Sequence, residues 1–407
     1  MKFNPKTSAN CKPSSPPGTV VLQPVLLTNI QEVPNTIALF LLSRDSLSVK
    51  KVPIDAEEFN QWVTEYRQML QSGDSRYRPL SATLYDHLIR PVAAEIEALN
   101  PQQLAIIATG SLRQFPFETL RDSENDQFLL EQYPIHYLTR LSSRSLLASP
   151  SPSRFPTFPL WTLPLLLGII GMGATVKHHW KLGGTLLTLA LVSTTFLPRF
   201  SGGYGVLGFA NPKPQDPLFN LPGTEAEVDA LLRLAPESEI YRHHQATLEV
   251  FKRQSSRHRY LHIATHGCFQ QLGCCLQETC PDYQPDMKAN TLLFADGEYP
   301  LADAALLGLQ DTQLVALTAC QTALQTNLDG DAIMGMAYIW ERAGARALMA
   351  TLWNVDDAAT AAVTTEFYRL IMEEGLSKVE ALRQAKLSQS HRHPFFWSPL
   401  VLIGDPR

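Results

Sequence analysis

Two residues that could take part in nucleophilic chemistry follow two apolar runs of the chain. His266 comes shortly after the run Tyr260–Ala264, and Cys320 comes shortly after the run Leu314–Leu317. Short apolar runs of this kind are typical of strands buried on both faces of a parallel sheet. Because the functional groups of such sheets collect beyond the carboxyl ends of the strands, we expect His266 and Cys320 to lie at one edge.

A cysteine and a histidine at one sheet edge could form a catalytic pair. A thiol is a strong nucleophile only as the thiolate, and a neighbouring imidazole can accept its proton or stabilise its charge. Each residue alone is more often structural, since most buried cysteines are inert packing and a lone histidine is usually a satisfied polar residue. The combination of His266 with Cys320 at two strand ends therefore favours nucleophilic catalysis.

The sequence around both residues resembles the CHAT family, whose members are caspase-like domains of the same clan as separase. The stretch 265–267, Thr-His-Gly, resembles the family's histidine motif, and the stretch 318–322, Thr-Ala-Cys-Gln-Thr, resembles its cysteine motif. The distance between the two residues in the chain is near the value of about 50 found in caspases. Further stretches that fit the family are 115–118, 128–131, 221–227, 343–346 with 351–357, and 393–397 with 402–405.

The resemblance implies a cysteine endopeptidase of caspase-like fold. Cys320 would attack the scissile carbonyl, and His266 would protonate the leaving amine as general acid and later activate water. The oxyanion would lie against the backbone N–H groups of Gly267 and Cys320. A glycine at position 267 would leave no side chain in the path of the substrate.

The residues that would select the substrate are less clearly marked. Gln321 stands where the family commonly has glutamate. Asp356 and Asp357 follow an apolar run, 347–353, and we expect them at the same sheet edge as the dyad. They are candidates for binding a basic side chain, or they cap the helix that we expect from residue 358.

Strands and helices alternate along the chain and must hold these residues in place. We expect strands at 20–27, 36–42, 46–52, 104–108, 206–209, 260–264, 314–317 and 345–351. We expect helices at 56–70, at 80–99 with a kink at Pro91, and at 224–234, 332–343, 358–373 and 378–390. The start of helix 224–234 resembles a capping box from Thr224 to Glu227. This alternation predicts an α/β fold with a mainly parallel sheet flanked by helices on both faces.

The composition points to one unusual segment. Charged residues make up 18% of the chain, below the roughly 25% usual in soluble domains, whereas hydrophobic residues make up 45%. The blocks 160–176 and 182–198 contain no charged residue and flank a polar turn at 177–181. Each block of about 17 residues would be ~25 Å long as a helix, at the lower edge of membrane-spanning length. We therefore predict an inserted transmembrane helical hairpin, with a buried hairpin in a soluble core as the alternative.

Two passes would return the chain to the side from which it entered the membrane. The basic residues outside the hairpin outnumber the two lysines of its turn, which places the remainder of the chain in the cytoplasm. The first residues lack the apolar block of an export signal, which agrees with that side. We expect four parts: a disordered tail (1–17), the N-terminal part of a CHAT domain (18–154), the transmembrane hairpin (155–200) and the catalytic part (201–407).

Four of the six cysteines, Cys268, Cys274, Cys275 and Cys280, crowd into one short stretch. Their irregular spacing contains no C-x-x-C pair, so a thiol-rich loop is favoured over a metal site or a regulatory disulfide. The stretch 203–208 satisfies G-x-G-x-x-G but does not follow a strand and open a helix, so we expect no dinucleotide site. We expect neither a metal nor a cofactor.

The leading hypothesis is a membrane-attached bacterial CHAT-type cysteine endopeptidase that cleaves a protein or peptide substrate. The alternative is a non-proteolytic interaction or signalling module of the same fold at the membrane. We expect contact with the membrane through residues 160–198 and regulation by this membrane segment or by a separate protein. The net charge of −5 offers no basic excess for a phosphate backbone, so we expect no nucleic-acid partner.

Overall fold

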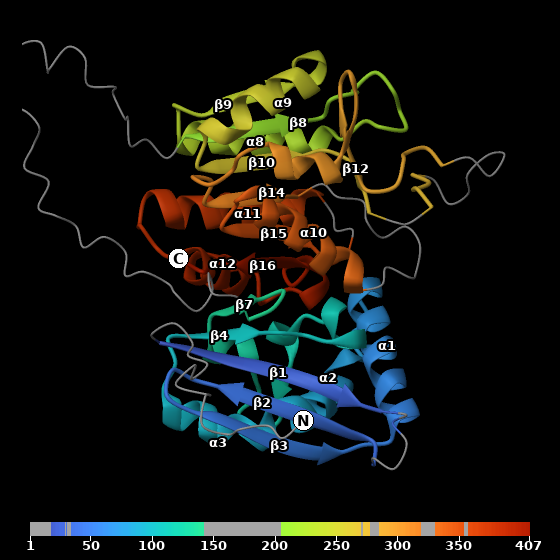
Figure 1. Cartoon of the computed structure of the whole chain (residues 1–407), viewed down its shortest axis with the longest axis vertical. Coiled ribbons are helices and arrows are strands. Elements are labelled where there is room, and N and C mark those ends of the chain that lie inside the picture. The colour runs from blue at the N-terminus through green and yellow to red at the C-terminus, as the bar shows by residue number, and fades with distance from the viewer. Residues whose placement is uncertain are drawn as a thin grey trace, which may run out of the picture. The chain divides into compact units, whose positions relative to one another are not determined.

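The computed structural model describes residues 18–28, 30, 34–141, 205–269, 272–276, 285–318, 330–353 and 357–407, with residues 330–332 and 357 described by backbone alone. Eleven strands within these residues form one sheet, and Figure 1 shows it from β9 at the top to β3 at the bottom. In spatial order the strands are β3 (Leu47–Pro53), β2 (Thr36–Leu42), β1 (Thr19–Leu27), β4 (Gln103–Ile106), β7 (Ile135–Tyr137), β16 (Leu400–Gly404), β15 (Ala347–Thr351), β14 (Leu314–Leu317), β10 (Tyr260–Ala264), β8 (Val206–Ala210) and β9 (Glu239–Arg242).

Most neighbouring strands of this sheet run parallel. The antiparallel pairs that the structure describes in it are β1 with β2, β2 with β3, and β15 with β16. The prediction of a mainly parallel sheet is therefore confirmed. Because β15, β14, β10 and β8 are mutually parallel, their carboxyl ends lie at one edge, where functional groups are expected.

Helices cover both faces of the sheet, as the alternation of elements predicted. Successive residues of a strand point to opposite faces, so Leu261 packs into one apolar core and Tyr260 into another. The first core takes α1 (Ala56–Ser72), α2 (Tyr77–Leu88), α3 (Arg90–Leu99), α9 (Leu248–Gln254) and α10 (Gly330–Ala343). The second core takes α8 (Pro222–Leu234), α11 (Asp357–Met372) and α12 (Lys378–Leu387).

Short elements complete the described fold. The strands β11 (Gly267–Cys268), β12 (Thr291–Phe294) and β13 (Gly297–Pro300) form a small antiparallel sheet directly after β10. The strands β5 (Arg121–Asp122) and β6 (Gln127–Phe128) pair in a hairpin that leads into α4 (Leu129–Gln132). The small sheet matters most for the site, because it begins one residue after His266.

Two helix boundaries differ from the predictions for physical reasons. The expected kinked helix 80–99 is two helices, because α2 ends at Leu88 and Pro91 lies in the first turn of α3, where its missing N–H costs no hydrogen bond. The expected capping box at Thr224 is wrong. Helix α8 begins earlier, at Pro222, and the Thr224 hydroxyl donates to the Leu221 carbonyl at 2.7 Å. Glu227 is buried instead of capping the helix.

The predicted membrane hairpin lies outside the described residues, as does the tail 1–17. Among the helices that the structure describes, none has both the length and the apolar character needed to cross a membrane.

A buried ion pair joins the parts of the chain before and after the predicted hairpin. Lys386 of α12 forms an ion pair with Glu118, and both side chains are almost fully enclosed. The Tyr137 hydroxyl of β7 donates to the second Glu118 oxygen at 2.5 Å and accepts the Phe117 N–H at 2.9 Å. Removal of a partner from such a pair leaves an uncompensated buried charge. The ion pair therefore stabilises the packing of α12 against β7 and Glu118, a region that we call the junction.

Candidate active site

Strands β10 and β14, which precede the two predicted catalytic residues, are neighbours in the sheet. Ile263 of β10 lies opposite Leu317 of β14 in a parallel pair. His266 follows Ile263 by three residues, and Cys320 follows Leu317 by three residues. This equal spacing from a matched pair is the basis for expecting both residues at the same edge of the sheet. Cys320 itself lies outside the described residues.

The His266 side chain is buried and keeps both ring nitrogens without a partner. It is 1% exposed, and neither Nδ1 nor Nε2 has a hydrogen bond to any residue that the structure describes. The Phe219 ring packs edge-on against the imidazole, with ring centroids 6.0 Å apart. Burial lowers the pKa of His266 to about 4, and the nearby Phe219 backbone opposes this shift without reaching hydrogen-bond geometry. The imidazole is therefore neutral near pH 7 and can accept a proton.

The backbone N–H of Gly267, predicted to bind the oxyanion, points away from strand β12. The Leu293 N–H donates to the His266 carbonyl at 2.9 Å, so these two residues form a hydrogen-bonded pair of the β11–β12 ladder. Hydrogen-bonded and non-hydrogen-bonded pairs alternate in an antiparallel ladder. Gly267, opposite Leu292, therefore takes the non-hydrogen-bonded position, and its N–H points away from β12.

The need for glycine at position 267 has a packing cause that the sequence did not reveal. A Cβ atom there would come within 2.7 Å of Phe269 Cζ and 3.1 Å of Leu292 Cδ2. The expected reason was clearance for the substrate. The structure adds a second reason, since a larger residue would displace the Phe269 ring or the Leu292 side chain.

Strand β15 contributes polar groups at the same edge. It pairs in parallel with β14 and ends at Thr351. Among the described residues, neither the Thr351 hydroxyl nor the Trp353 indole N–H has a hydrogen-bond partner, although both side chains are buried. Asp357 is the first residue of α11, which agrees with the helix-start alternative, and Asp356 lies outside the described residues. The sequence missed Thr351 and Trp353 because neither residue type is reactive.

A disulfide joins Cys268 and Cys274 next to His266. The favoured interpretation of these cysteines as a loop of free thiols is wrong for this pair, and Cys275 is disulfide-bonded as well. Both half-cystines of the first bridge are buried in a small apolar cluster, against which Phe219 packs. The bridge thus supports the surface that holds Phe219 against the imidazole. Cys280 lies outside the described residues.

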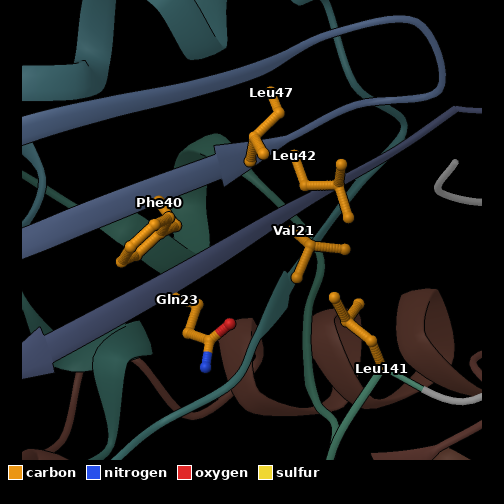
Figure 2. A pocket seen from close by; sticks show the side chains of 6 residues that line it. All are labelled: Val21, Gln23, Phe40, Leu42, Leu47 and Leu141. Carbon is orange, nitrogen blue, oxygen red and sulfur yellow. The ribbon is translucent and has the colours of Figure 1, made fainter. Parts of the chain in front are cut away.

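A separate pocket lies on the first three strands, away from β10 and β14. Its volume is about 160 Å³, and Figure 2 shows Leu141 facing the strand residues across it. The lining residues are Val21, Gln23, Phe40, Leu42, Leu47 and Leu141. The pocket offers no nucleophile or titratable group, so we do not assign it to the site. Within the described parts of the chain, no three His, Cys, Asp or Glu side chains are grouped as metal ligands.

The chain resembles many solved structures, and three of them show how low the sequence identity is. Two are of the Saccharomyces cerevisiae separase–securin complex. One matches with a TM-score of 0.46 and 10% identity over 95% of this chain and 30% of that chain. The other matches with a TM-score of 0.41 and 12% identity over 79% of this chain and 17% of that chain. The complex of Porphyromonas gingivalis RgpB pro- and mature domains matches with a TM-score of 0.40 and 11% identity, over 86% and 76%.

The family of the chain is shown by comparison of its sequence with protein-family models. No curated protein matches the chain. The model of the CHAT domain matches residues 78–405, which include both predicted catalytic residues and most of the large sheet. The chain therefore belongs to the CHAT domain family.

Proposed function

We propose that this CHAT domain is a cysteine endopeptidase with Cys320 as nucleophile and His266 as the group that moves the proton. The observation that carries the proposal is the register of Ile263 with Leu317, together with a buried imidazole whose nitrogens have no partner among the described residues. A buried polar group without a partner is costly, so its retention is best explained by a function.

The reaction follows from these two side chains. Neutral His266 accepts the thiol proton as the Cys320 sulfur bonds to the scissile carbonyl carbon. The same proton passes to the amide nitrogen as the C–N bond breaks, which releases the amine and leaves a thioester. His266 then takes a proton from water, the hydroxide attacks the thioester, and the proton returns to the sulfur. A pKa of about 4 keeps the ring in the proton-accepting form at neutral pH.

Two further contacts complete the proposal for the substrate. The outward N–H of Gly267 and the N–H of Cys320 stabilise the oxyanion by hydrogen bonds that are strongest in the transition state. Asp356 and Asp357 follow the carboxyl end of β15 and would favour a basic substrate side chain.

Labelling with peptidyl acyloxymethyl ketones tests the dyad directly. Peptides with basic, acidic and apolar leading residues are offered to the wild type, and covalent attachment is followed by mass spectrometry. We expect labelling at Cys320, its loss in Cys320→Ala, and a fall of about 10²–10⁴-fold in His266→Ala. Cys11→Ala is the matched control and should label as the wild type does. Absence of labelling with every peptide, or labelling that persists in Cys320→Ala, would favour the non-proteolytic module.

We also propose that residues 160–198 attach the domain to a membrane, with the catalytic part on the cytoplasmic side. The support is the length of the two uncharged blocks and the basic residues outside them. Alkaline carbonate extraction of membranes from expressing cells tests this. We expect the full chain to remain in the pellet, and release into the supernatant would contradict two membrane passes.

A further inference from the structure

Four buried polar side chains meet beneath the candidate active site. His262 projects from β10, Thr318 follows the last residue of β14, Glu227 belongs to α8 and Tyr368 belongs to α11. All four are at most 6% exposed. They lie between the sheet and two helices that the sequence separates widely, and none of them takes part in the dyad.

One hydrogen bond of this cluster, from Thr318, reaches the Glu227 carboxylate, and His262 lies close to the same carboxylate. The Thr318 hydroxyl donates to Glu227 Oε2 at 3.0 Å, which is the shortest contact of the cluster. His262 Nε2 lies 3.5 Å from Glu227 Oε1 and 3.5 Å from Thr318 Oγ1. The Tyr368 hydroxyl lies 3.4 Å from His262 Nδ1. An imidazole with its proton on Nε2 is compatible with these distances, since it can accept from tyrosine and point its proton toward Thr318 and Glu227, although Glu227 Oε1 has no hydrogen bond among the described residues.

The Thr318 contact fixes the point at which the chain leaves the sheet. Thr318 is the first residue beyond β14 and precedes Cys320 by two residues. Its backbone N–H also reaches the Ile263 carbonyl of β10, at a long 3.4 Å. The hydroxyl is therefore the stronger restraint on this residue. It holds the strand end against helix α8.

Helix α8 is itself anchored at the same edge. Asn211 follows the last residue of β8 and accepts the Leu221 N–H through its side-chain oxygen at 3.0 Å. Its amide nitrogen donates to Glu225 at 2.7 Å. Asn211 has φ 41°, a left-handed conformation that asparagine tolerates better than most residues. The helix that carries Glu227 thus starts from a fixed point on the sheet.

We propose that Glu227 is a positioning residue that acts through the Thr318 hydroxyl and sets the place of the nucleophilic segment. The proposal rests on the assignment of Cys320 as nucleophile. Burial of a carboxylate with a histidine partner costs more free energy of desolvation than burial of an apolar side chain of similar size. Orientation explains its presence, since a misplacement of about 1 Å at a reacting atom can cost on the order of 100-fold in rate.

The test separates inactivation rate from probe binding. For an acyloxymethyl ketone peptide that labels the wild type, we expect kinact to fall at least about tenfold in Thr318→Val and Glu227→Leu, with KI nearly unchanged. Thr318→Ser restores the hydroxyl and Glu227→Gln restores an acceptor oxygen, so both should recover most of the rate. The double variant Thr318→Val with Glu227→Leu should be no slower than the slower single variant, because both remove one contact.

Asp229→Leu is the matched control, because Asp229 lies on the same helix but forms a surface ion pair with Arg242. It should leave kinact unchanged. An unchanged kinact in folded Thr318→Val, or no recovery in Thr318→Ser, would overturn the inference. The rate at which iodoacetamide alkylates Cys320, measured by mass spectrometry, reports the effect of the Thr318–Glu227 contact on the thiol without any peptidase reaction. If no peptide labels the wild type, the proposed function fails, while equal alkylation rates in wild type and Thr318→Val would overturn the positioning role separately.

Discussion

The junction at β7 and the edge at β10 and β14 each bury a carboxylate, a tyrosine and a histidine, but they pair them differently. At the junction, Glu118 faces the Lys386 ammonium and the Tyr137 hydroxyl. At the edge, Glu227 faces a threonine hydroxyl and the His262 ring. The first carboxylate has an ammonium group as partner, whereas the second has a hydroxyl group and an imidazole ring.

A second comparison concerns the hydrogen bonds of His136 at the junction and of His266 at the edge. His136 of β7 donates from Nδ1 to the Gly404 carbonyl at 3.0 Å, whereas His266 has no hydrogen-bond partner among the described residues. The junction leaves one histidine nitrogen, His136 Nε2, without a partner among the described residues, whereas the edge leaves both nitrogens of His266 and the Thr351 hydroxyl without one. Satisfied buried pairs stabilise a fold, while unsatisfied ones persist where chemistry uses them. The contrast supports a structural role for the junction and a functional role for the edge.

The largest effect should come from the junction ion pair. Lys386→Ala leaves the Glu118 carboxylate buried and unpaired, so we expect a loss of about 3–5 kcal/mol in the free energy of unfolding. Urea denaturation followed by circular dichroism measures this. Arg369→Ala is the control, because Arg369 pairs with Glu366 at the half-exposed surface of α11 and should contribute about 1 kcal/mol or less.

The double variant Glu118→Leu with Lys386→Met removes both charges at once. It should recover much of the stability that Lys386→Ala loses, because no charge is left without a partner. A Lys386→Ala protein as stable as the wild type would remove the contrast between the two regions.

The sequence predicted most of the large sheet because its strands are short, apolar and separated by turns. The runs at 260–264 and 314–317 agree with β10 and β14 to the residue, since burial on both faces leaves both strands apolar apart from His262. Strand β16 was missed, although its run is equally apolar. It pairs antiparallel with β15 after the last helix, and no local pattern indicates that reversal.

The sequence did not predict the hydrogen-bonded cluster around Glu227 for a similar reason. Glu227 was predicted to cap a helix, because a glutamate three residues after threonine fits that pattern. Its burial depends on helix α8 packing against β10 and α11, which the residues near Glu227 do not encode. The disulfide between Cys268 and Cys274 likewise depends on the short β11 strand and the return of the chain beside it.

The next largest effect concerns the free energy of unfolding at acid pH. Burial lowers the pKa of both His136 and His266 from 6.5 to about 4. Between these values the unfolded chain binds a proton that the folded chain excludes, so stability falls as the pH drops from 6.5 to 4. Each histidine should contribute about 3 kcal/mol to that fall, at ~1.4 kcal/mol per pKa unit.

Substitution by asparagine separates the two histidines. Both His136→Asn and His266→Asn should flatten the dependence of unfolding free energy on pH between 6.5 and 4. At pH 7, His136→Asn should also lose about 1 kcal/mol with its hydrogen bond to Gly404, whereas His266→Asn should lose little. Urea titrations at four pH values decide this. A His266→Asn protein that keeps the full acid dependence would show that the His266 ring is solvated in the folded protein, unlike the His136 ring.

The smallest contrast is between the two tyrosines, and it isolates the hydrogen bonds from the charges. Tyr137→Phe removes a donor to the Glu118 carboxylate and leaves the buried Phe117 N–H unsatisfied, so we expect a loss of about 2–3 kcal/mol. Tyr368→Phe removes only a long contact of 3.4 Å to His262, so we expect a loss of about 1 kcal/mol or less. Both variants keep the ring and its packing, and the difference in urea midpoint between them measures the polar part alone. Equal losses would mean that the edge tyrosine is held as tightly as the junction tyrosine, in which case its contact with His262 would be a structural bond and the two regions would differ in charge alone.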